Sequence, residues 1–576
     1  PRRRRSTVVP MAAGTLEGGT WRPPPGLTEA QRQAVMASEP LVCVLAGAGA
    51  GKTRVLTLRV ARRCHDRSAE ARRVLVCTFS RRAADELRSR LWALDVDGPT
   101  TGTFHRTALA LLRQWRAERG AGPPEVLADR RAALAAVLAE RRGAAPAGRA
   151  RRRAEPAPVA LSQLESEIGW AKARLVAPQH YEEAAVSQRR RTVLPAATVA
   201  ELYRRYEEVR QRRGLLDLDD LLLACYEALA GDDAFARAVR WRFRHLFVDE
   251  MQDVNPAQFR LLMALLGDEP DLFVVGDPRQ SVYGWNGADP TLLDRLPELL
   301  PGTRQIRLDE NHRSTPQVVA VAASVLGLDH DRGIPTSNRP DGPVPRVVAH
   351  DTDAEEAEWV ARQLWLAHRP GRRWSQLAVL ARTNTQLQAV ASALGRARIP
   401  FQLAGADLAP ASDVPARAGG RAGQPDDGAG GEEGTGGRAG HGDDGAGDAD
   451  SGDAHGGVVL ATFHRAKGLQ WPAVFVIGLS ADLMPLRGAR SPAARDEERR
   501  LLYVALSRAE VELTCTWARY RDDATRAAGE APRAPSPWLD PVVQACEALR
   551  TSIAPPDPEE VAARLAALRA RLLDRA

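Results

Sequence analysis

The sequence predicts an α/β fold in which parallel strands alternate with helices, and three observations support this prediction. The first is that brief apolar runs alternate with stretches of amphipathic-helix spacing between residues 27 and 405. Strands buried on both faces of a parallel sheet look like this, because crossover helices cover them. The runs that we predict to be strands are 41–46, 73–78, 245–249, 272–276 and 376–381.

The second observation is an interruption of this alternation between residues 108 and 214. The segment is helical in pattern almost throughout, apart from an Arg-, Ala- and Pro-rich stretch at 141–160. Its apolar residues recur at helical rather than strand spacing. We therefore interpret it as a helical insertion into the first α/β domain.

The third observation is a change of composition at 406–457, which contains 16 of the 47 glycines of the chain. The segment carries three arginines and eleven acidic residues, a net charge of −8. Its apolar surface is too small to offset the entropy of ordering, so we expect a disordered acidic linker. We also expect a disordered basic arm at 1–23 and a helical tail at 546–576.

The composition excludes several classes of protein. With 44% hydrophobic and 27% charged residues among 576, the chain is neither fully disordered nor collagen-like, and no apolar run is long enough to cross a membrane. The six cysteines form no CxxC pair, so we expect reduced thiols in a cytoplasmic protein rather than a zinc or iron–sulfur site. The net charge of +7 permits nucleic-acid binding without demonstrating it.

Lysine is almost absent from the chain. Of the 80 basic residues, only Lys52, Lys172 and Lys467 are lysines. A lysine that remains where arginine is used elsewhere is a candidate for a position that needs a compact ammonium group. Lys52 and Lys467 lie in motifs, whereas Lys172 could either contact DNA or lie on the surface.

A glycine-rich turn follows the predicted strand 41–46 and precedes a predicted helix. Residues 46–53 (AGAGAGKT) match a phosphate-binding loop with Ala in place of the first Gly. In such a loop backbone N–H groups point at a polyphosphate, Lys52 neutralises the β- and γ-phosphates, and the Thr53 hydroxyl can hold Mg²⁺. The alternative is a turn that only caps a helix. The predicted ATP ligands here are Ala46, Gly47, Ala48, Gly49, Ala50, Gly51, Lys52, Thr53 and Arg54.

Two carboxylates follow the predicted strand at 245–249. Asp249 is placed to hold Mg²⁺ through water, and the neighbouring Glu250 to polarise the attacking water. The alternative is a pair of exposed acids at a strand end. The position one domain's length after the phosphate-binding loop favours the catalytic interpretation.

Residues 249–253 (DEMQD) resemble the DExQD motif of the UvrD/Rep family of superfamily 1 DNA helicases, and other segments resemble that family's motifs in the same order. They are the Q motif at 27–31 (LTEAQ), Ia at 78–86 (TFSRRAADE), Ib at 102–105 (GTFH), III at 276–288 (GDPRQSVYGWNGA), IV at 308–315 (LDENHRST), V at 462–471 (TFHRAKGLQW) and VI at 497–509 (EERRLLYVALSRA). The match covers nearly all of 27–405 and 458–540.

The resemblance implies a fold of two RecA-like parallel-sheet P-loop motor domains with a helical 1B insertion. Domain 1A would comprise 24–107 and 215–316, 1B would be 108–214, and domain 2A would comprise 317–405 and 458–545. It also implies an ATP-dependent 3′→5′ DNA helicase or single-stranded DNA translocase, with ATP and Mg²⁺ as cofactors. We expect a monomer that acts on 3′-tailed duplex in DNA repair or recombination.

The resemblance assigns further residues to the nucleotide. Gln31 would read the adenine edge, His312 would stack on adenine, and Gln470 would bond the ribose. Gln280 would sense the γ-phosphate, and Arg313 and Arg508 would reach it from the second domain as arginine fingers. Charge that develops during hydrolysis would be stabilised by Lys52, Gln280, Arg313 and Arg508.

Single-stranded DNA requires aromatic platforms and phosphate contacts. The predicted platforms at motif positions are Phe79, Phe104, Tyr283 and Trp285. For Phe104, and for Phe463 in motif V, packing in the core is an equal alternative. The other predicted DNA-binding residues are Thr78, Gly102, Thr103, His105, Thr462, His464 and Lys467.

The chain departs from the family pattern at four places. His312 replaces a tyrosine, Asn286 replaces an arginine of motif III, and Gln470 replaces a glutamate. The linker at 406–457 stands where the family has a helical 2B domain. The second function hypothesis is therefore an ATP-regulated DNA-binding module, or a translocase without robust unwinding. The motifs alone also leave an RNA helicase open.

Overall fold

The computed structural model describes residues 15–17, 20–127, 129–143, 158–190, 192–328, 333–404, 456–552 and 566. Most of the predicted basic arm, the acidic linker up to residue 455 and nearly all of the tail after residue 552 lie outside the described residues. None of the described helices combines the length and the apolarity that a membrane crossing would need.

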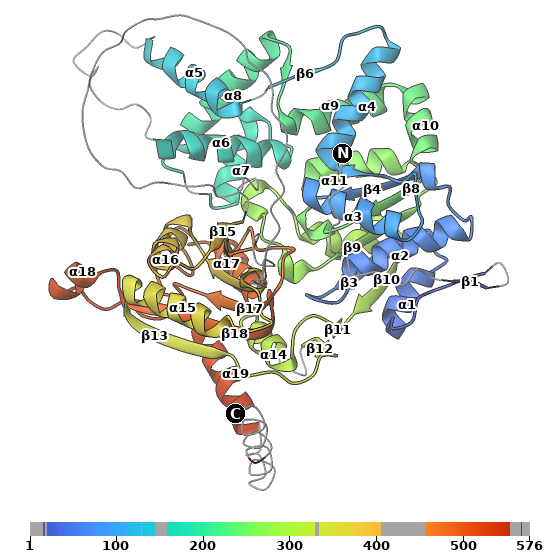
Figure 1. The fold of residues 1–576 in the computed structure, drawn as a ribbon. Helices are drawn as coiled ribbons and strands as arrows, with labels where there is room; N and C mark the ends of the chain where they lie inside the picture. The colour runs from blue at the N-terminus through green and yellow to red at the C-terminus, as the bar shows by residue number, and fades with distance from the viewer. Residues whose placement is uncertain are drawn as a thin grey trace, which may run out of the picture.

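The first sheet has six parallel strands in the order β10-β3-β9-β8-β4-β5 (Figure 1). One face is covered by α1, α2 and α3, and the other by α4, α9, α10 and α11. Alternate residues of the four inner strands enter the two cores, so that Val42 packs on one side and Cys43 on the other. The strands are β3 (Leu41–Ala46), β4 (Val74–Thr78), β5 (Thr100–Thr103), β8 (His245–Val248), β9 (Leu272–Gly276) and β10 (Arg304–Leu308). The helices are α1 (Glu29–Met36), α2 (Lys52–His65), α3 (Arg81–Ala93), α4 (Phe104–Glu118), α9 (Leu218–Gly231), α10 (Asp233–Arg242) and α11 (Pro256–Leu266).

The second sheet is also six-stranded and parallel, in the order β13-β18-β17-β14-β16-β15. Helices α15 and α16 cover one face, and α14, α17 and α19 cover the other. Residues 405–455 connect the edge strand β15 to its neighbour β16. The strands are β13 (Arg346–Thr352), β14 (Leu377–Ala381), β15 (Phe401–Leu403), β16 (Val458–Thr462), β17 (Trp471–Val476) and β18 (Ala509–Tyr520). The helices are α14 (Pro316–Ser324), α15 (Asp353–Ala367), α16 (Asn384–Arg396), α17 (Pro492–Leu506) and α19 (Leu539–Ser552).

These two sheets confirm the predicted α/β class. All five predicted strands are present, with ends that differ by at most one residue. Arg73 belongs to the short helix η1 (Ala71–Arg73), while Asp249 follows β8.

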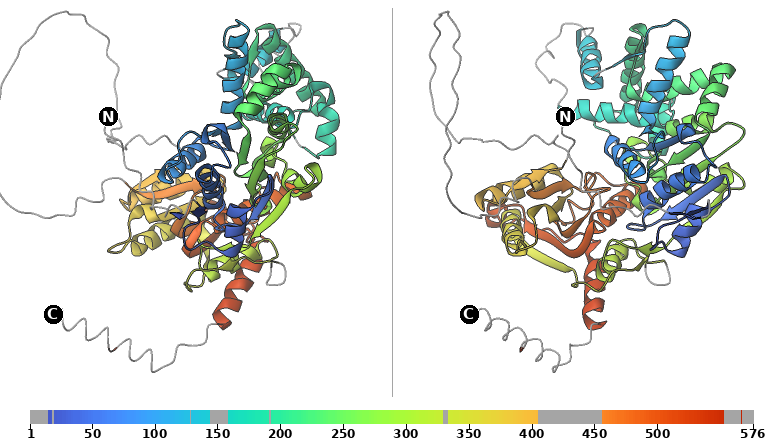
Figure 2. Two further views of the ribbon diagram at one scale, coloured as in Figure 1. Left: turned by 90° about the vertical axis from the view of Figure 1, so that its right-hand side faces the viewer. Right: turned by 45° about the vertical axis from the view of Figure 1, so that its right-hand side comes forward.

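A helical part stands above the first sheet (Figure 2). Helices α5 (Arg130–Gly143), α6 (Pro158–Ala173), α7 (Tyr181–Ser187) and α8 (Ala196–Arg212) share a separate core that includes Leu134, Ile168 and Tyr206. The first turns of the predicted insertion behave differently, because α4 packs Ala108 and Leu111 against the first sheet. The chain enters and leaves the helical part through the parallel pair β6 (Glu125–Val126) and β7 (Leu215–Leu216). The domain limits within the chain stay predictions.

Shorter elements complete the described chain. They are the pair β1 (Thr15–Glu17) and β2 (Thr20–Arg22), the pair β11 (Glu310–Asn311) and β12 (Thr336–Ser337), helices α12 (Thr291–Asp294), α13 (Leu296–Leu299) and α18 (Asp523–Ala527), and the 3₁₀ turns η2 (Pro178–His180), η3 (Met251–Asp253), η4 (Pro278–Gln280), η5 (Gly284–Asn286) and η6 (Trp374–Gln376).

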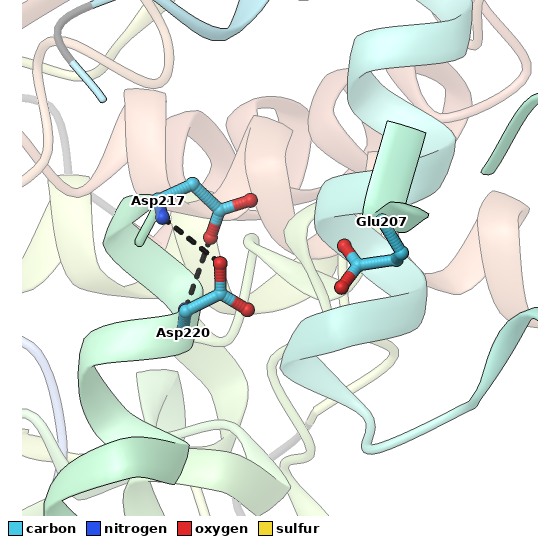
Figure 3. Close-up of side chains that lie close together, drawn as sticks. All are labelled: Glu207, Asp217 and Asp220. Atoms are coloured by element: carbon cyan, nitrogen blue, oxygen red, sulfur yellow. Dashed lines mark hydrogen bonds between the residues drawn. The ribbon is translucent and has the colours of Figure 1, made fainter. Parts of the chain in front are cut away.

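Lys172 is buried in the helical part, so it lies neither on the surface nor at a DNA-facing loop. Its Nζ lies 2.8 Å from a Glu207 oxygen, 2.7 Å from Asp217 and 2.6 Å from Asp220. Figure 3 shows these carboxylates converging from α8 and the start of α9. Burial favours loss of the proton, but the three acids raise the pKa of Lys172 and keep it charged. The ammonium lies among three carboxylates that are grouped closely enough to hold a metal ion.

Replacing Lys172 with Met is expected to destabilise the helical part by about 3 kcal/mol, because three buried carboxylates lose a shared cation and keep only their ion pairs with Arg130 and Arg210. Urea denaturation followed by circular dichroism measures the loss. Arg204→Met is the matched control, because Arg204 pairs with Glu208 on the exposed face of α8 and should cost less than about 1 kcal/mol. Equal losses in the two variants would contradict the assignment of a buried network.

Candidate nucleotide and DNA site

The glycine-rich loop lies between β3 and α2, and a side chain would be crowded at two of its glycines. Gly49 and Gly51 have φ values of +74° and +83°. A Cβ on Gly49 would lie 2.7 Å from Asn311 Oδ1, and one on Gly51 would lie 3.0 Å from Gln31 Nε2. The loop therefore depends on glycine for both its backbone conformation and its packing. It ends at the first turn of α2, whose free N–H groups favour an anion.

The functional side chains of the first domain meet at this loop. Lys52 Nζ lies 3.3 Å from the Ala46 carbonyl and 3.5 Å from that of Gly47. Thr53 Oγ1 lies 3.4 Å from Asp249 Oδ2, so the hydroxyl and the carboxylate face one another across the ends of β3 and β8. Both are oxygen ligands of the kind that Mg²⁺ prefers.

The adjacent carboxylates have different electrostatic surroundings. Burial, and then the Glu250 charge, raise the pKa of Asp249 to about 7. Burial alone would also raise the pKa of Glu250, but the ammonium groups of Lys52 and Lys467 lower it below its usual value. Glu250 has a left-handed backbone, with φ +53°, a conformation that is strained for a residue other than glycine. Asp249 is therefore suited to bind a cation, whereas Glu250 remains an ionised carboxylate.

Two guanidinium groups approach this site. Arg508, which follows α17, donates from Nη2 to Gln280 Oε1 at 3.2 Å. Arg313 donates from Nε to Gln470 Oε1 at 2.7 Å and from Nη1 to the Ser507 carbonyl at 3.3 Å. The structure thus places both predicted arginine fingers at the interface between the two α/β domains, which we call the seam.

The residues predicted to read the nucleoside hold the loop itself. Gln31 donates from Nε2 to the Ala50 carbonyl at 2.9 Å and accepts from the Thr28 N–H. The His312 N–H donates to the Gly49 carbonyl at 3.0 Å, and its buried Nε2 has no partner among the described residues. Asn311, which the sequence analysis did not single out, donates to the Ala48 carbonyl at 2.8 Å.

Lys467 lies in a buried ion pair that joins the two domains. Its Nζ contacts both Asp253 oxygens, at 2.8 and 2.6 Å, and donates to the Gln280 carbonyl at 2.6 Å. It also lies 5.1 Å from the centre of the Tyr283 ring. The side chain is only 7% exposed, a placement that does not support the predicted contact with DNA.

Helix α17 adds two contacts that the sequence analysis missed, although both residues lie in motif VI. Glu497 accepts from the Trp285 N–H at 3.4 Å, and Arg500 donates to the Ser281 carbonyl at 2.8 Å. They lie three residues apart, so one face of α17 holds the segment that carries Gln280 and Trp285. Asn286, the departure from the family pattern in this segment, is exposed.

Gly284→Ala tests the contact between α17 and this segment, because a Cβ on Gly284 would lie 2.7 Å from Glu497 Oε2. We expect DNA-stimulated ATP turnover to fall roughly 10-fold, since the aromatic platform and Gln280 share this short segment. Steady-state turnover measures the effect. Gly122→Ala is the matched control, because Gly122, like Gly284, has no positive φ and nothing lies within 4 Å of its Cβ. An equal loss in both variants would contradict a specific role.

An aromatic cluster lies beside the seam, and we define it as Phe79, Tyr283, Trp285 and His464. Phe79 stacks on Tyr283 with ring centres 4.6 Å apart, and the other ring pairs lie 6.2–6.4 Å apart. His464 follows β16 of the second sheet, whereas the other three belong to the first domain. Trp285 is 47% and Phe79 is 37% exposed, so both present ring surface to solvent. Burial lowers the pKa of His464 to about 4, which keeps its ring neutral at pH 7.

The other residues predicted to contact DNA do not belong to the aromatic cluster. Phe104 and Phe463 are 3% and 0% exposed and belong to the hydrophobic cores, so packing explains them. Thr78 is buried, and the Thr103 hydroxyl accepts from the Arg106 N–H as the cap of α4. Gly102 is buried, His105 and Thr462 are partly buried, and burial lowers the pKa of His105.

Fold and site together define a P-loop nucleotide motor in which two parallel-sheet domains face a common seam. Comparison with known families agrees: residues 27–301 match the UvrD/REP helicase N-terminal domain, and residues 306–407 and 446–520 match the UvrD-like helicase C-terminal domain. The chain belongs to the UvrD/REP helicase family.

Named relatives cover much of the chain. The ATP-dependent DNA helicase UvrD2 of Mycobacterium tuberculosis is 35% identical over 590 residues, covering 90% of this chain and 83% of that protein. DNA helicase II of Escherichia coli is 29% identical over 66% of this chain and 51% of its own length. The ATP-dependent DNA helicase PcrA of Staphylococcus epidermidis is 28% identical over 65% and 50%.

Proposed function

We propose that this chain is an ATP-dependent DNA helicase that moves 3′→5′ along single-stranded DNA. The observation that carries the proposal is the seam, where Lys52, Glu250 and Gln280 of the first domain meet Arg508 of the second. A triphosphate gripped there contacts both domains, so its hydrolysis changes their spacing. The relatives' names and the family membership support DNA as the substrate.

ATP and Mg²⁺ fit the residues present. The glycine loop and the first turn of α2 offer N–H groups for a polyphosphate. Burial and the neighbouring Glu250 charge raise the pKa of Asp249, so a cation beside this carboxylate would stabilise its ionised form. Thr53 and Asp249 would hold Mg²⁺, which would neutralise charge on the phosphates. We propose that Gln31, His312 and Gln470 complete the nucleotide site.

Glu250 polarises the attacking water in the proposed reaction. The Gln252 amide donates to Glu250 Oε2 at 2.5 Å and its own oxygen accepts from the Asp277 N–H at 2.9 Å, so the carboxylate is held against the strand that leads to Gln280. Lys52, Arg313 and Arg508 stabilise the negative charge on the phosphate as the bond to the leaving oxygen breaks.

ATP turnover with and without oligothymidylate tests the proposal, with Lys52→Ala as the inactive control. We expect single-stranded DNA to stimulate turnover, and competition between DNA and RNA strands to favour DNA. Turnover without stimulation would support the alternative of an ATP-regulated binding module. No turnover in the unmodified chain would contradict the helicase, and DNA affinity unchanged by ATP would contradict the binding module.

A translocase without robust unwinding is the second candidate. The connection between β15 and β16 has the acidic, glycine-rich composition of a linker, and Asn286 lacks the charge that the family has there. Strand displacement on a 3′-tailed duplex, compared with translocation on single strands, separates the candidates. We further propose that the protein acts as a monomer, in the cytoplasm, in DNA repair or recombination. Sedimentation in the presence of DNA tests whether it is a monomer.

A further inference from the structure

An open pocket lies along the edge strand of the first sheet, away from the nucleotide. β5 pairs with β4 alone, and a cavity of about 390 Å³ lies beside it. Residues of α3, β5 and α4 line it, together with the turn between α10 and β8. No acidic side chain is among its lining residues.

Three arginines make this pocket basic. Arg88 is fixed by an ion pair with Asp85 at 2.7 Å and a hydrogen bond to the Thr101 carbonyl at 3.2 Å. Arg106 and Arg242 also line the pocket, and in the described part of the chain neither has a carboxylate within ion-pair distance. Arg242 instead donates to the neutral Gln114 amide at 3.2 Å. Arg106 and Arg242 therefore present guanidinium groups without a paired carboxylate, and an external anion can pair with them.

Two exposed tryptophans lie close in sequence to arginines that line this pocket. Trp92 lies one helical turn beyond Arg88 on α3 and is 69% exposed, and Trp241 precedes Arg242 and is 68% exposed. The Arg73 guanidinium covers one face of Trp241 at 4.9 Å from the ring centre. Arginines and exposed rings also mark protein interfaces, but the unpaired guanidinium groups of Arg106 and Arg242 favour a polyanion with bases that stack.

The pocket begins near the aromatic cluster. Gly102 and Arg106 lie at the carboxyl end of β5. Phe79 follows β4 at the same end of the sheet. Arg242 and Phe243 precede β8 and lie at the opposite end of the sheet. The pocket thus follows β5 from the proposed DNA path toward the far end of the strand.

We propose that this pocket binds backbone phosphates of the single strand beyond the aromatic cluster, which lengthens the DNA site along the edge of the first sheet. The inference rests on the proposed function, because it assumes that DNA occupies the cluster. Arg88, Arg106 and Arg242 contact phosphate oxygens, and the two tryptophans are available to bases.

Binding of a length series of fluorescent oligothymidylates tests the inference on the full chain. The variants are Arg106→Ala, Arg242→Ala and the pair, with Arg307→Ala as the matched control, because Arg307 is exposed on β10 at the opposite edge of the same sheet. We expect the paired variant to bind long strands roughly 10-fold less tightly and to bind the shortest strands unchanged. The slope of log affinity against log salt should fall by about 0.7 for each arginine removed.

Two outcomes would overturn the inference. One is unchanged affinity and salt slope in the paired variant, which would leave the surface to a protein partner. The other is displacement of long strands by inorganic phosphate at constant ionic strength from the unmodified chain but not from Arg242→Ala, which would assign the pocket to free phosphate. Failure of the proposed function is distinct, since it appears as absent DNA-stimulated turnover in the unmodified chain.

Discussion

Glu250→Gln is expected to abolish ATP turnover while the chain still binds nucleotide and DNA. The amide keeps the shape and hydrogen bonds of the carboxylate but cannot attract the proton of the attacking water. Loss of a positioned general base costs roughly 10²–10⁴-fold in rate, so turnover should fall within this range. Single-turnover hydrolysis with bound DNA measures the chemical step directly.

The matched control is Glu298→Gln, which removes the same charge from an exposed residue that pairs with Arg295 on the surface. It should turn over ATP like the unmodified chain. Binding of a fluorescent ATP analogue should be retained in Glu250→Gln. A variant that turned over ATP within about threefold of the unmodified chain would assign the base to another group.

Lys467→Met is expected to uncouple DNA from ATP turnover. It removes the cation beside the buried Asp253 and the contact to the Gln280 carbonyl, so this link between the two domains is lost. Because the same ammonium lies against the Tyr283 ring, we expect the stimulation by DNA to fall at least roughly 10-fold while DNA affinity changes little. Turnover at saturating DNA, together with fluorescence anisotropy, separates the two quantities.

The loss of DNA-stimulated ATP turnover in Lys467→Met should depend on pH. Burial raises the pKa of Asp253 to about 7 even with Lys467 in contact, so without the ammonium the carboxyl should keep its proton to a higher pH. Below pH 7 both the variant and the unmodified chain then carry a largely neutral Asp253, so the difference in DNA-stimulated turnover between them should shrink. Above pH 7 this difference should widen. Lys467→Arg is the conservative test, because it keeps the charge. If Lys467→Met instead bound DNA more weakly and kept normal stimulation, the result would support the predicted contact between Lys467 and DNA.

Motifs of adjacent residues allowed much of the nucleotide site to be predicted. The phosphate-binding loop requires glycines, a lysine and a threonine in one short stretch between a strand and a helix, and all of this can be inferred from local sequence. The roles of Glu497 and Arg500 could not be predicted, because their partners are backbone groups more than two hundred residues away.

Exposure also separates similar residues. Phe79 and Phe104 each follow a strand, but Phe104 begins α4, which packs on the sheet, whereas Phe79 precedes α3 and remains in part exposed. A sequence pattern shows that an aromatic residue stands at a strand end. Whether its ring faces a core or solvent depends on how the following helix packs.

By itself, the sequence determined that this chain has parallel α/β domains, a phosphate-binding loop and paired carboxylates at a strand end. It also singled out Lys172 and Lys467, because lysine is so rare in an arginine-rich chain. Only the tertiary structure decided what those two ammonium groups do: each is surrounded by acceptors from distant segments, three carboxylates for Lys172, and Asp253 with the Gln280 carbonyl for Lys467. The physical reason is that a buried charge is stable only where folding brings its counter-charges together, and no local pattern records that convergence.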